Sequence, residues 1–212
     1  MTPVNPAPGL AEGTFGVGTY RASGGKAFPG LVLPDGQVFD LSADYHDTHA
    51  IFDDWTAALD LMADLAVKQD RPAQAFADLA KLPVVAHPNM LCAGANYRQH
   101  VAEMMTHNKF NQHARLSGES DADFFQRNLA EIDRRAREGM PFCWTGLHSS
   151  LCGADDDVPL PLVGEQPDWE LEFGMILAGT GRYLPPEEAG DLIAAYVMVN
   201  DIGTVDEFRR TD

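Results

Sequence analysis

Alternating apolar and polar residues predict a β-strand over residues 167–179, PDWELEFGMILAG. The alternation runs through five positions: Trp169, Glu170, Leu171, Glu172 and Phe173. A two-residue period is typical of a strand with one buried and one solvated face. An apolar run over residues 175–178 follows, so we expect this strand to become buried on both faces toward its end. The segment AAYVMVND, which ends at Asp201, predicts a second strand.

Helical spacing predicts an amphipathic helix over residues 50–66. Its apolar positions share one face: Ile51, Trp55, Leu59, Met62 and Leu65. We expect this helix to pack on a small N-terminal sheet, in which Pro-Asp-Gly forms the hairpin turn of LVLPDGQVFDL. Short helices are expected over residues 71–80 and from Pro186. A charged helix is expected over residues 117–139, with an acidic start and a basic end that suit the helix dipole.

Residues 82–105, LPVVAHPNMLCAGANYRQHVAEMM, predict the entry into a second domain. The stretch NMLCAGA is typical of a buried strand that Gly94 ends. A helix is expected to follow, with Asn96 as its N-cap and Gln99 three residues later in a capping-box pattern. We therefore divide the chain into a small N-terminal domain over residues 1–82 and a larger domain over residues 83–212.

The composition and net charge of the chain limit which partners it can bind and which cellular compartment suits it. The 212 residues carry a net charge of -17, which repels nucleic acid and anionic membranes, so we expect neither as a partner. The three cysteines form no Cys-x-x-Cys pair, so we expect neither a disulfide framework nor a zinc knuckle, and a reducing cytoplasm fits. The first ten residues do not have the pattern of a signal peptide, and no apolar run has the length of a membrane span.

Three carboxylates form the first candidate site. Glu170 and Glu172 are two residues apart on one strand and point the same way, roughly 7 Å apart. Asp201 lies at the end of the other strong strand, where side chains converge on the rim of a sheet. Such a set of oxygens suits Mg²⁺ or Mn²⁺. On spacing alone the alternative stays open that all three are ordinary solvated carboxylates of an acidic protein.

A histidine and a glutamate form the second candidate site. His100 and Glu103 are three residues apart on the expected helix, so the carboxylate can hydrogen-bond one ring nitrogen. That bond would fix the tautomer and raise the basicity of the ring, as a general base requires. An exposed His-Glu pair without a catalytic role is the alternative that the residues leave open.

Three motifs in order, CAGANYRQHVAEM, DWELEFGMILAG and AYVMVNDIG, resemble the fumarylacetoacetate hydrolase family. The resemblance covers roughly residues 82–205. It implies an α+β, mostly β fold: a mixed β-sheet or β-roll domain of that type, incomplete at its C-terminus, after a small α+β domain. It also implies that Glu170, Glu172 and Asp201 are magnesium ligands, and that His100 is the catalytic base with Glu103 as its dyad partner.

The implied activity is metal-dependent hydrolysis of a C–C bond in a 2-oxo or 1,3-diketo acid of the fumarylacetoacetate or acylpyruvate type. Sister enzymes in the family imply alternatives, namely a lyase, hydratase or dehydratase acting on a 2-oxo acid. Because family chains continue with further strands, we expect an open sheet edge and exposed apolar surface that a homodimer would cover.

Two departures from the family pattern leave a further alternative open. Gly146 stands where the resemblance predicts a lysine before the Ser-Ser-Leu turn, and Val205 stands where many members have an arginine. Arg209 and Arg210 are nearby cations that would be the substitutes. The loss of the two expected cations is consistent with a catalytically impaired family member or fragment.

Overall fold

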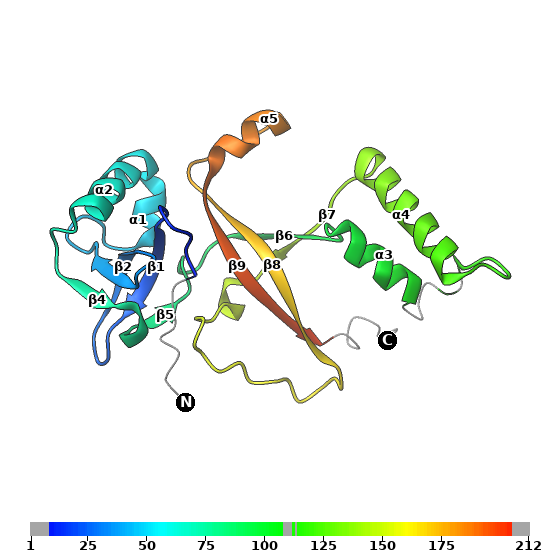
Figure 1. Ribbon diagram of the computed structural model, residues 1–212, viewed down its shortest axis with the longest axis horizontal. Coiled ribbons are helices and arrows are strands. Elements are labelled where there is room, and N and C mark those ends of the chain that lie inside the picture. The colour runs from blue at the N-terminus through cyan, green and yellow to red at the C-terminus, as the bar shows by residue number, and fades with distance from the viewer. Residues whose placement is uncertain (1–8, 108–111, 113, 205–212) are drawn as a thin grey trace. The chain divides into compact units, whose positions relative to one another are not determined.

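The computed structural model describes residues 9–107, 112 and 114–204 (Figure 1). The chain divides into two compact units. One consists of residues 1–86 together with residues 151–212, and the other of residues 87–150. The residues of each unit that the structure describes are taken by themselves below.

A five-stranded antiparallel sheet forms the N-terminal module, by which we mean residues 9–86. Its strands are β1 (Gly16–Arg21), β2 (Ala27–Val32), β3 (Gln37–Asp40), β4 (Ala73–Ala75) and β5 (Ala80–Leu82), in the order β4-β3-β2-β1-β5. The predicted hairpin is confirmed: Gly36 takes a φ of 84° in the turn between β2 and β3. That left-handed conformation is easily reached only by glycine.

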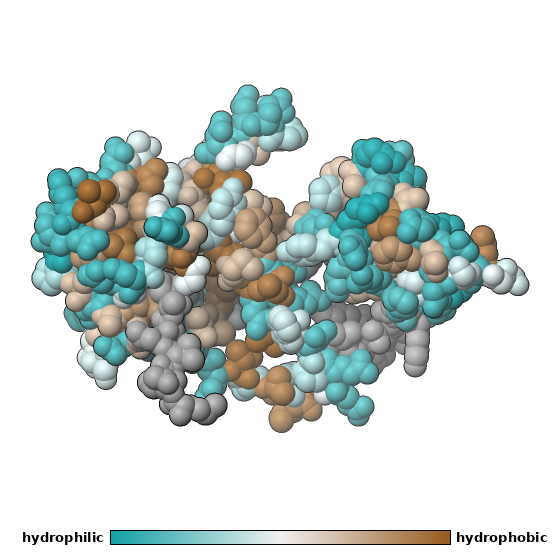
Figure 2. All heavy atoms as spheres, viewed as in Figure 1, coloured by the Kyte–Doolittle hydropathy of each residue, from teal (hydrophilic) through white to brown (hydrophobic). Residues whose placement is uncertain are grey.

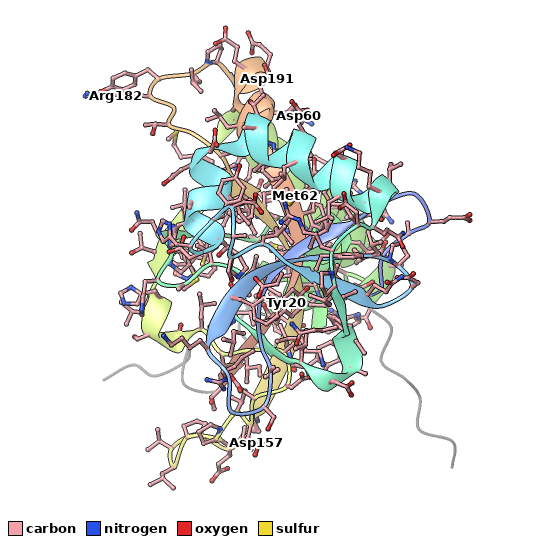
Figure 3. All side chains as sticks on the ribbon, turned by 90° about the vertical axis from the view of Figure 1, so that its left-hand side faces the viewer. Tyr20, Asp60, Met62, Asp157, Arg182 and Asp191 are labelled. Carbon is pink, nitrogen blue, oxygen red and sulfur yellow. The ribbon has the colours of Figure 1, made fainter. Side chains whose placement is uncertain are left out.

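Two helices, α1 (Thr48–Asp53) and α2 (Trp55–Lys68), pack on this sheet in place of the single helix predicted over residues 50–66. Asp47 begins α1 by accepting a hydrogen bond from the Ala50 amide. Met62 lies between α2 and the sheet, whereas Asp60 lies on the outer side of the helix (Figure 3). The predicted apolar face is buried at Ile51, Met62 and Leu65, while Leu59 is 39% exposed.

The helix predicted over residues 71–80 is wrong. This segment instead forms β4, a short 3-10 turn over Phe76–Asp78, and β5. β4 pairs with β3 and β5 pairs with β1. The hydrogen bonds to two neighbouring strands outweigh the local helical preference of its alanines.

The 87–150 unit contains a two-stranded antiparallel sheet and two helices. The strands are β6 (Met90–Gly94) and β7 (Phe142–Gly146), and the helices are α3 (Arg98–His107) and α4 (Asp121–Glu138). The expected strand NMLCAGA exists, but the prediction that it is buried is wrong, because Leu91 is 76% exposed. The charged helix begins later than expected, at its N-cap Ser120, and carries acidic residues in its first turn and arginines in its last.

The long strands β8 (Pro167–Leu177) and β9 (Ile193–Thr204) form an antiparallel hairpin, which also includes the short helix α5 (Pro186–Ala189) in its connection. Both strands confirm the sequence prediction, but the expected burial on both faces does not occur. One face exposes its large apolar side chains, and Figure 2 shows such brown residues at the surface where Figure 1 places the hairpin. These residues are Trp169, Leu171, Phe173, Met175, Leu177, Tyr196, Met198 and Ile202.

Candidate active site

The hairpin brings the three predicted carboxylates to one face. Glu170 pairs directly with Asp201 across the two strands, and Glu172 pairs with Val199. Cross-strand partners share a face, as do residues two apart on one strand, so all three side chains start from the same side. Opposite partners in such a pair have Cβ atoms about 5 Å apart. The strand register therefore places Asp201 next to Glu170, although the two residues are thirty-one positions apart in the sequence.

This face also carries Asp168, which the sequence reasoning missed. It precedes Glu170 by two residues in the same strand, and its Oδ1 accepts a hydrogen bond from the Trp169 amide at 2.9 Å. The two-residue spacing that singled out Glu170 and Glu172 is the signal that could have found it. Trp169, Leu171, Phe173 and Met175 occupy the other face, so over residues 168–173 the alternation that predicted the strand also separates its acidic side from its hydrophobic side.

The chemistry of these side chains fits a hard divalent cation, because carboxylate oxygens are the ligands that Mg²⁺ and Mn²⁺ prefer. Glu170 and Asp201 are exposed and Glu172 is half-buried, so the two exposed side chains have room to change rotamer. Within the described ranges, no three His, Cys, Asp or Glu residues are already arranged so that they could hold a metal ion. The strands thus supply the backbone positions of the three carboxylates, while convergence on a cation requires side-chain rotation.

Helix α3 carries His100 and Glu103, and both side chains are exposed. The helix begins after Tyr97, whose carbonyl accepts the first helical hydrogen bond, from the Val101 amide. The prediction of Asn96 as the N-cap is therefore wrong. Its Nδ2 instead donates to the Ala93 carbonyl at 2.8 Å, next to Ala95, which has a φ of 58°.

The carboxylate of Glu103 does not make the expected hydrogen bond. Its Oε1 accepts from Gln99 Nε2 at 3.0 Å, and no hydrogen bond joins it to His100 in the part of the chain that the structure describes. Gln99 is one turn from Glu103, a spacing at which helix side chains meet. Gln99 therefore competes with His100 for the same carboxylate.

Two contacts fasten α3 to α4. Arg98 makes a bidentate bridge to Asp133, with Nε to Oδ1 at 2.6 Å and Nη2 to Oδ2 at 2.8 Å. These hydrogen bonds from the guanidinium lower the pKa of the Asp133 carboxyl. In the buried layer, Asn128 Nδ2 donates to Thr106 Oγ1 at 3.1 Å. The helix that carries His100 and Glu103 is thus held to its neighbour near both of its ends.

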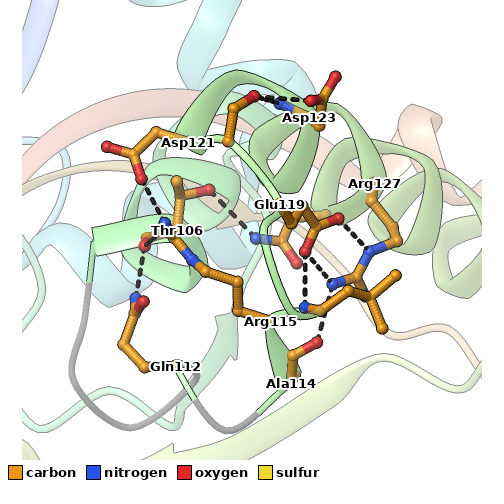
Figure 4. Close-up of polar contacts among 11 residues, drawn as sticks. Thr106, Gln112, Ala114, Arg115, Glu119, Asp121, Asp123 and Arg127 are labelled. Atoms are coloured by element: carbon orange, nitrogen blue, oxygen red, sulfur yellow. Dashed lines mark hydrogen bonds and ion pairs between the residues drawn. The ribbon is translucent and has the colours of Figure 1, made fainter.

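The connection between α3 and α4 adds a polar network around the end of α3 (Figure 4). Gln112 Nε2 donates to the Thr106 carbonyl at 2.6 Å. Glu119 accepts two hydrogen bonds from Arg127, at 2.8 and 2.7 Å, which lower the pKa of its carboxyl to about 2. Arg115 and Arg127 place their guanidinium carbons 4.8 and 5.0 Å from the centre of the buried Phe124 ring.

The structure describes one of the two positions at which the family pattern predicts a cation. Gly146 ends β7, and a Cβ placed there would lie 2.8 Å from Met90 Cε and 3.5 Å from Cys92 Sγ. The space for a side chain at this position is therefore partly taken by Met90. Val205, Arg209 and Arg210 lie outside the described residues.

The geometry and the ordered motifs agree with a comparison to protein-family models. The model of the C-terminal domain of fumarylacetoacetate (FAA) hydrolase matches residues 89–211. The chain belongs to the fumarylacetoacetate hydrolase family. All five candidate residues, His100, Glu103, Glu170, Glu172 and Asp201, lie inside the matched range.

Relatives that match this chain are named as hydrolases. The chain is 27% identical over 188 residues to a hydrolase-named protein of Burkholderia lata, covering 84% of this chain and 52% of the relative. It is 25% identical over 189 residues to the 2,4-didehydro-3-deoxy-L-rhamnonate hydrolase of a Sphingomonas species, covering 84% of this chain and 50% of the relative. The chain thus spans about half the length of these relatives.

A solved structure supports the fold. The fumarylacetoacetate hydrolase of Exiguobacterium antarcticum superposes with a TM-score of 0.60 at 20% identity, covering 92% of this chain and 58% of that one. Every strand pairing among the described residues is antiparallel.

None of the helices that the structure describes has the length and apolar character needed to cross a membrane.

Proposed function

We propose that this chain carries the metal ligands and the general base of a hydrolase that cleaves a C–C bond in a 2-oxo or 1,3-diketo acid. The observation that carries the proposal is the strand register that sets Glu170 opposite Asp201, with Glu172 on the same face. The name of the Sphingomonas relative supports the substrate class, because it places oxo groups at carbons 2 and 4 of a sugar acid. Acylpyruvates have their oxo groups at the same two carbons, and acids of the fumarylacetoacetate type share the 1,3-relationship of the two oxo groups.

The chemistry divides between the two candidate sites. Glu170, Glu172 and Asp201 would hold Mg²⁺ or Mn²⁺, which when bound supplies a Lewis acid that polarises a keto oxygen. His100 takes a proton from water, so that the water oxygen can attack the carbonyl carbon, and Glu103 stabilises the protonated ring. The hydroxyl stays on the attacked carbon, the C–C bond breaks, and the departing carbon receives the proton. One water is consumed and two shorter acids form.

The local charge supports this assignment. A chain with a net charge of -17 repels an anionic substrate, and a bound divalent cation would supply the positive centre that an oxo acid needs. The same net charge supports a small-molecule substrate rather than a nucleic acid. We assign the protein to the cytoplasm on its cysteine content, with three free thiols at Cys92, Cys143 and Cys152.

Metal binding is the direct test. Isothermal titration of the 212-residue chain with Mg²⁺ and with Mn²⁺ should give a binding heat that Glu170→Gln removes. Glu188→Gln changes a carboxylate in α5 of the same hairpin, and it should leave the heat unchanged. Equal heats in the parent and in Glu170→Gln, or none in the parent, would refute the metal site.

A catalytically impaired member is the second candidate function. The observation that favours it is Gly146, which offers no cation to a substrate carboxylate and whose side-chain space is partly occupied by Met90. Turnover of an acylpyruvate by the chain, lost in His100→Ala, would exclude this candidate. Mass spectrometry of the products also separates hydrolysis, which gives two carbon fragments, from hydration or dehydration, which gives one.

The finer fold and the assembly are also proposals. We assign residues 83–212 to a mixed sheet or β-roll of the fumarylacetoacetate hydrolase type, in keeping with the TM-score of 0.60. We propose a homodimer because the apolar face of β8 and β9 is exposed in the single chain. Sedimentation velocity should show a dimer, and Phe173→Glu on that face should shift it to monomer. A parent that sediments as a monomer would exclude the dimer.

A further inference from the structure

His87 and His148 lie near the two ends of the 87–150 unit, and their rings meet edge to face. The ring centroids are 4.9 Å apart and the ring planes make an angle of 86°, although the residues are sixty-one positions apart in the sequence. The pairing of β6 with β7 explains this contact. It is antiparallel and ends with Met90 opposite Gly146, so the two segments that carry the histidines leave the sheet side by side.

The backbone of His87 has a conformation that its local sequence does not favour. Its φ is 52°, which lies in the left-handed region, and the next residue is Pro88, before which an extended backbone is preferred. Left-handed backbone is uncommon in residues that have a side chain, and such conformations cluster where a protein holds a ligand. The ring of His87 is thus placed beside His148 at the cost of local strain.

Both imidazole rings are accessible to a ligand. His87 and His148 are exposed, and among the residues that the structure describes neither ring makes a hydrogen bond or an ion pair. The proposed reaction uses a different histidine, His100, and carboxylates as metal ligands, so it leaves this pair without a role. Imidazole nitrogens suit late first-row divalent cations such as Zn²⁺, Ni²⁺ and Cu²⁺, whereas Mg²⁺ prefers oxygen ligands.

The separation of the two rings suits one shared cation. A Zn–N bond of about 2.0–2.1 Å places the cation about 3.2 Å from the centroid of each ligating ring. Two centroids 4.9 Å apart then subtend an angle of about 100° at the cation, close to the tetrahedral angle that Zn²⁺ adopts. The χ2 angle of histidine has a broad range. Each exposed ring can therefore turn about its Cβ–Cγ bond and aim a nitrogen at the shared point, with little movement of its centroid.

We propose that His87 and His148 bind one late first-row divalent cation between them, with water at its remaining positions. The cation joins the two ends of the 87–150 unit, and its binding stabilises that unit by mass action. This site differs in chemistry from the carboxylate face of the hairpin, because it presents nitrogen rather than oxygen ligands. The proposal does not depend on the proposed hydrolase function.

Isothermal titration with Ni²⁺ tests the site. Ni²⁺ is the probe because Zn²⁺ also binds thiolates, and the chain has three free cysteines. The parent should bind one Ni²⁺ per chain. His87→Gln and His148→Gln should each weaken this binding about 10-fold or more, since even the loss of a group that only orients a ligand costs that much. Circular dichroism checks that both variants fold.

Two control variants remove other candidate ligands. His46→Gln removes an exposed imidazole whose Nε2 lies 3.4 Å from Asp47 Oδ2, and Glu170→Gln removes a carboxylate of the proposed Mg²⁺ site. Both should leave the Ni²⁺ binding unchanged. No binding in the parent, or equal binding in His87→Gln or His148→Gln, overturns the site. Binding that is lost in either control also overturns it, as do two Ni²⁺ per chain of which each single variant loses one.

Hydrogen exchange tests whether the bound cation joins the two ends of the unit. Saturating Ni²⁺ should slow exchange of the β6 and β7 amides in the parent, because a bridge restrains the sheet where its pairing ends. The same Ni²⁺ concentration should not slow exchange of these amides in His148→Gln. Unchanged exchange in the parent with Ni²⁺ bound overturns the bridge. Neither measurement requires turnover, so failure of the proposed function leaves this test intact.

Discussion

Tyr20 should make the N-terminal module lose stability at alkaline pH. The side chain lies in β1, is 4% exposed, and packs against Phe28 and Phe76 with ring centroids 6.1 Å away in both cases. Burial raises the pKa of its hydroxyl from 10.0 to about 12. The folded protein therefore holds the Tyr20 proton more tightly than the unfolded chain does.

The sign and size of the effect follow from this difference. The stability that Tyr20 contributes is fully present below pH 10, and it is lost as pH rises toward 12, because the unfolded chain releases the proton first. Two pKa units correspond to about 2.7 kcal/mol. Between about pH 9 and about pH 11.5 the expected loss is ~1.8 kcal/mol.

The assay compares the parent with Tyr20→Phe, which keeps the ring and removes the hydroxyl. Guanidinium unfolding at several pH values gives the free energy of unfolding of both proteins, and their difference cancels the titration of all other groups. That difference should shift by ~1.8 kcal/mol against the parent as the pH is raised over this range. A difference that stays constant with pH would refute the reasoning that burial holds the proton on Tyr20.

Two further predictions concern the helices that carry and support the candidate base. Phe124→Ala should destabilise the 87–150 unit by about 3–5 kcal/mol, because Phe124 is fully buried. Urea unfolding measures this loss, and it should show a much smaller loss for Phe125→Ala, which truncates the half-buried neighbour. Equal losses of stability in the two variants would contradict the packing. Asp133→Asn should speed amide hydrogen exchange in α3 at neutral pH. Because Arg98 lowers the pKa of Asp133, the bridge stabilises the fold above pH 3.8 and is lost as pH falls through the lowered pKa. Below that pKa the exchange rates of α3 in Asp133→Asn and in the parent should be equal. Glu138→Gln, which removes a bridge within α4, should leave the exchange rates of α3 unchanged at every pH.

Local pattern was sufficient for the elements that carry the site. Alternation predicted β8, and the spacing of apolar residues predicted most of α1 and α2, because both signals depend on period alone. The prediction of a helix over residues 71–80 failed because the conformation of this segment is set by its pairing with β1 and β3. The prediction that residues 175–178 are buried failed for a related reason. Burial depends on what packs against a face, and a strand pattern does not contain that information.

The site itself was predictable only in part. The types of residue at Glu170, Glu172 and Asp201 were visible in the sequence, but the pairing of Glu170 with Asp201 is a property of strand register. At the other site, the helical spacing of His100 and Glu103 was correct. The hydrogen bond was not, because Gln99 reaches the same carboxylate from the preceding turn, and spacing does not rank two neighbours that are equally near.

The register of the hairpin has a consequence for how this sequence can change. Between Ile176 and Leu177 the pairing shifts, so that Ala195 and Ile193 are successive partners across a bulge. Insertions in the connection over residues 178–192 should be tolerated, since longer loops cost little closure entropy. A single deletion between Ala195 and Asp201 would instead turn Asp201 to the opposite face from Glu170. The candidate metal site should therefore accept variation in loop length but not in strand length.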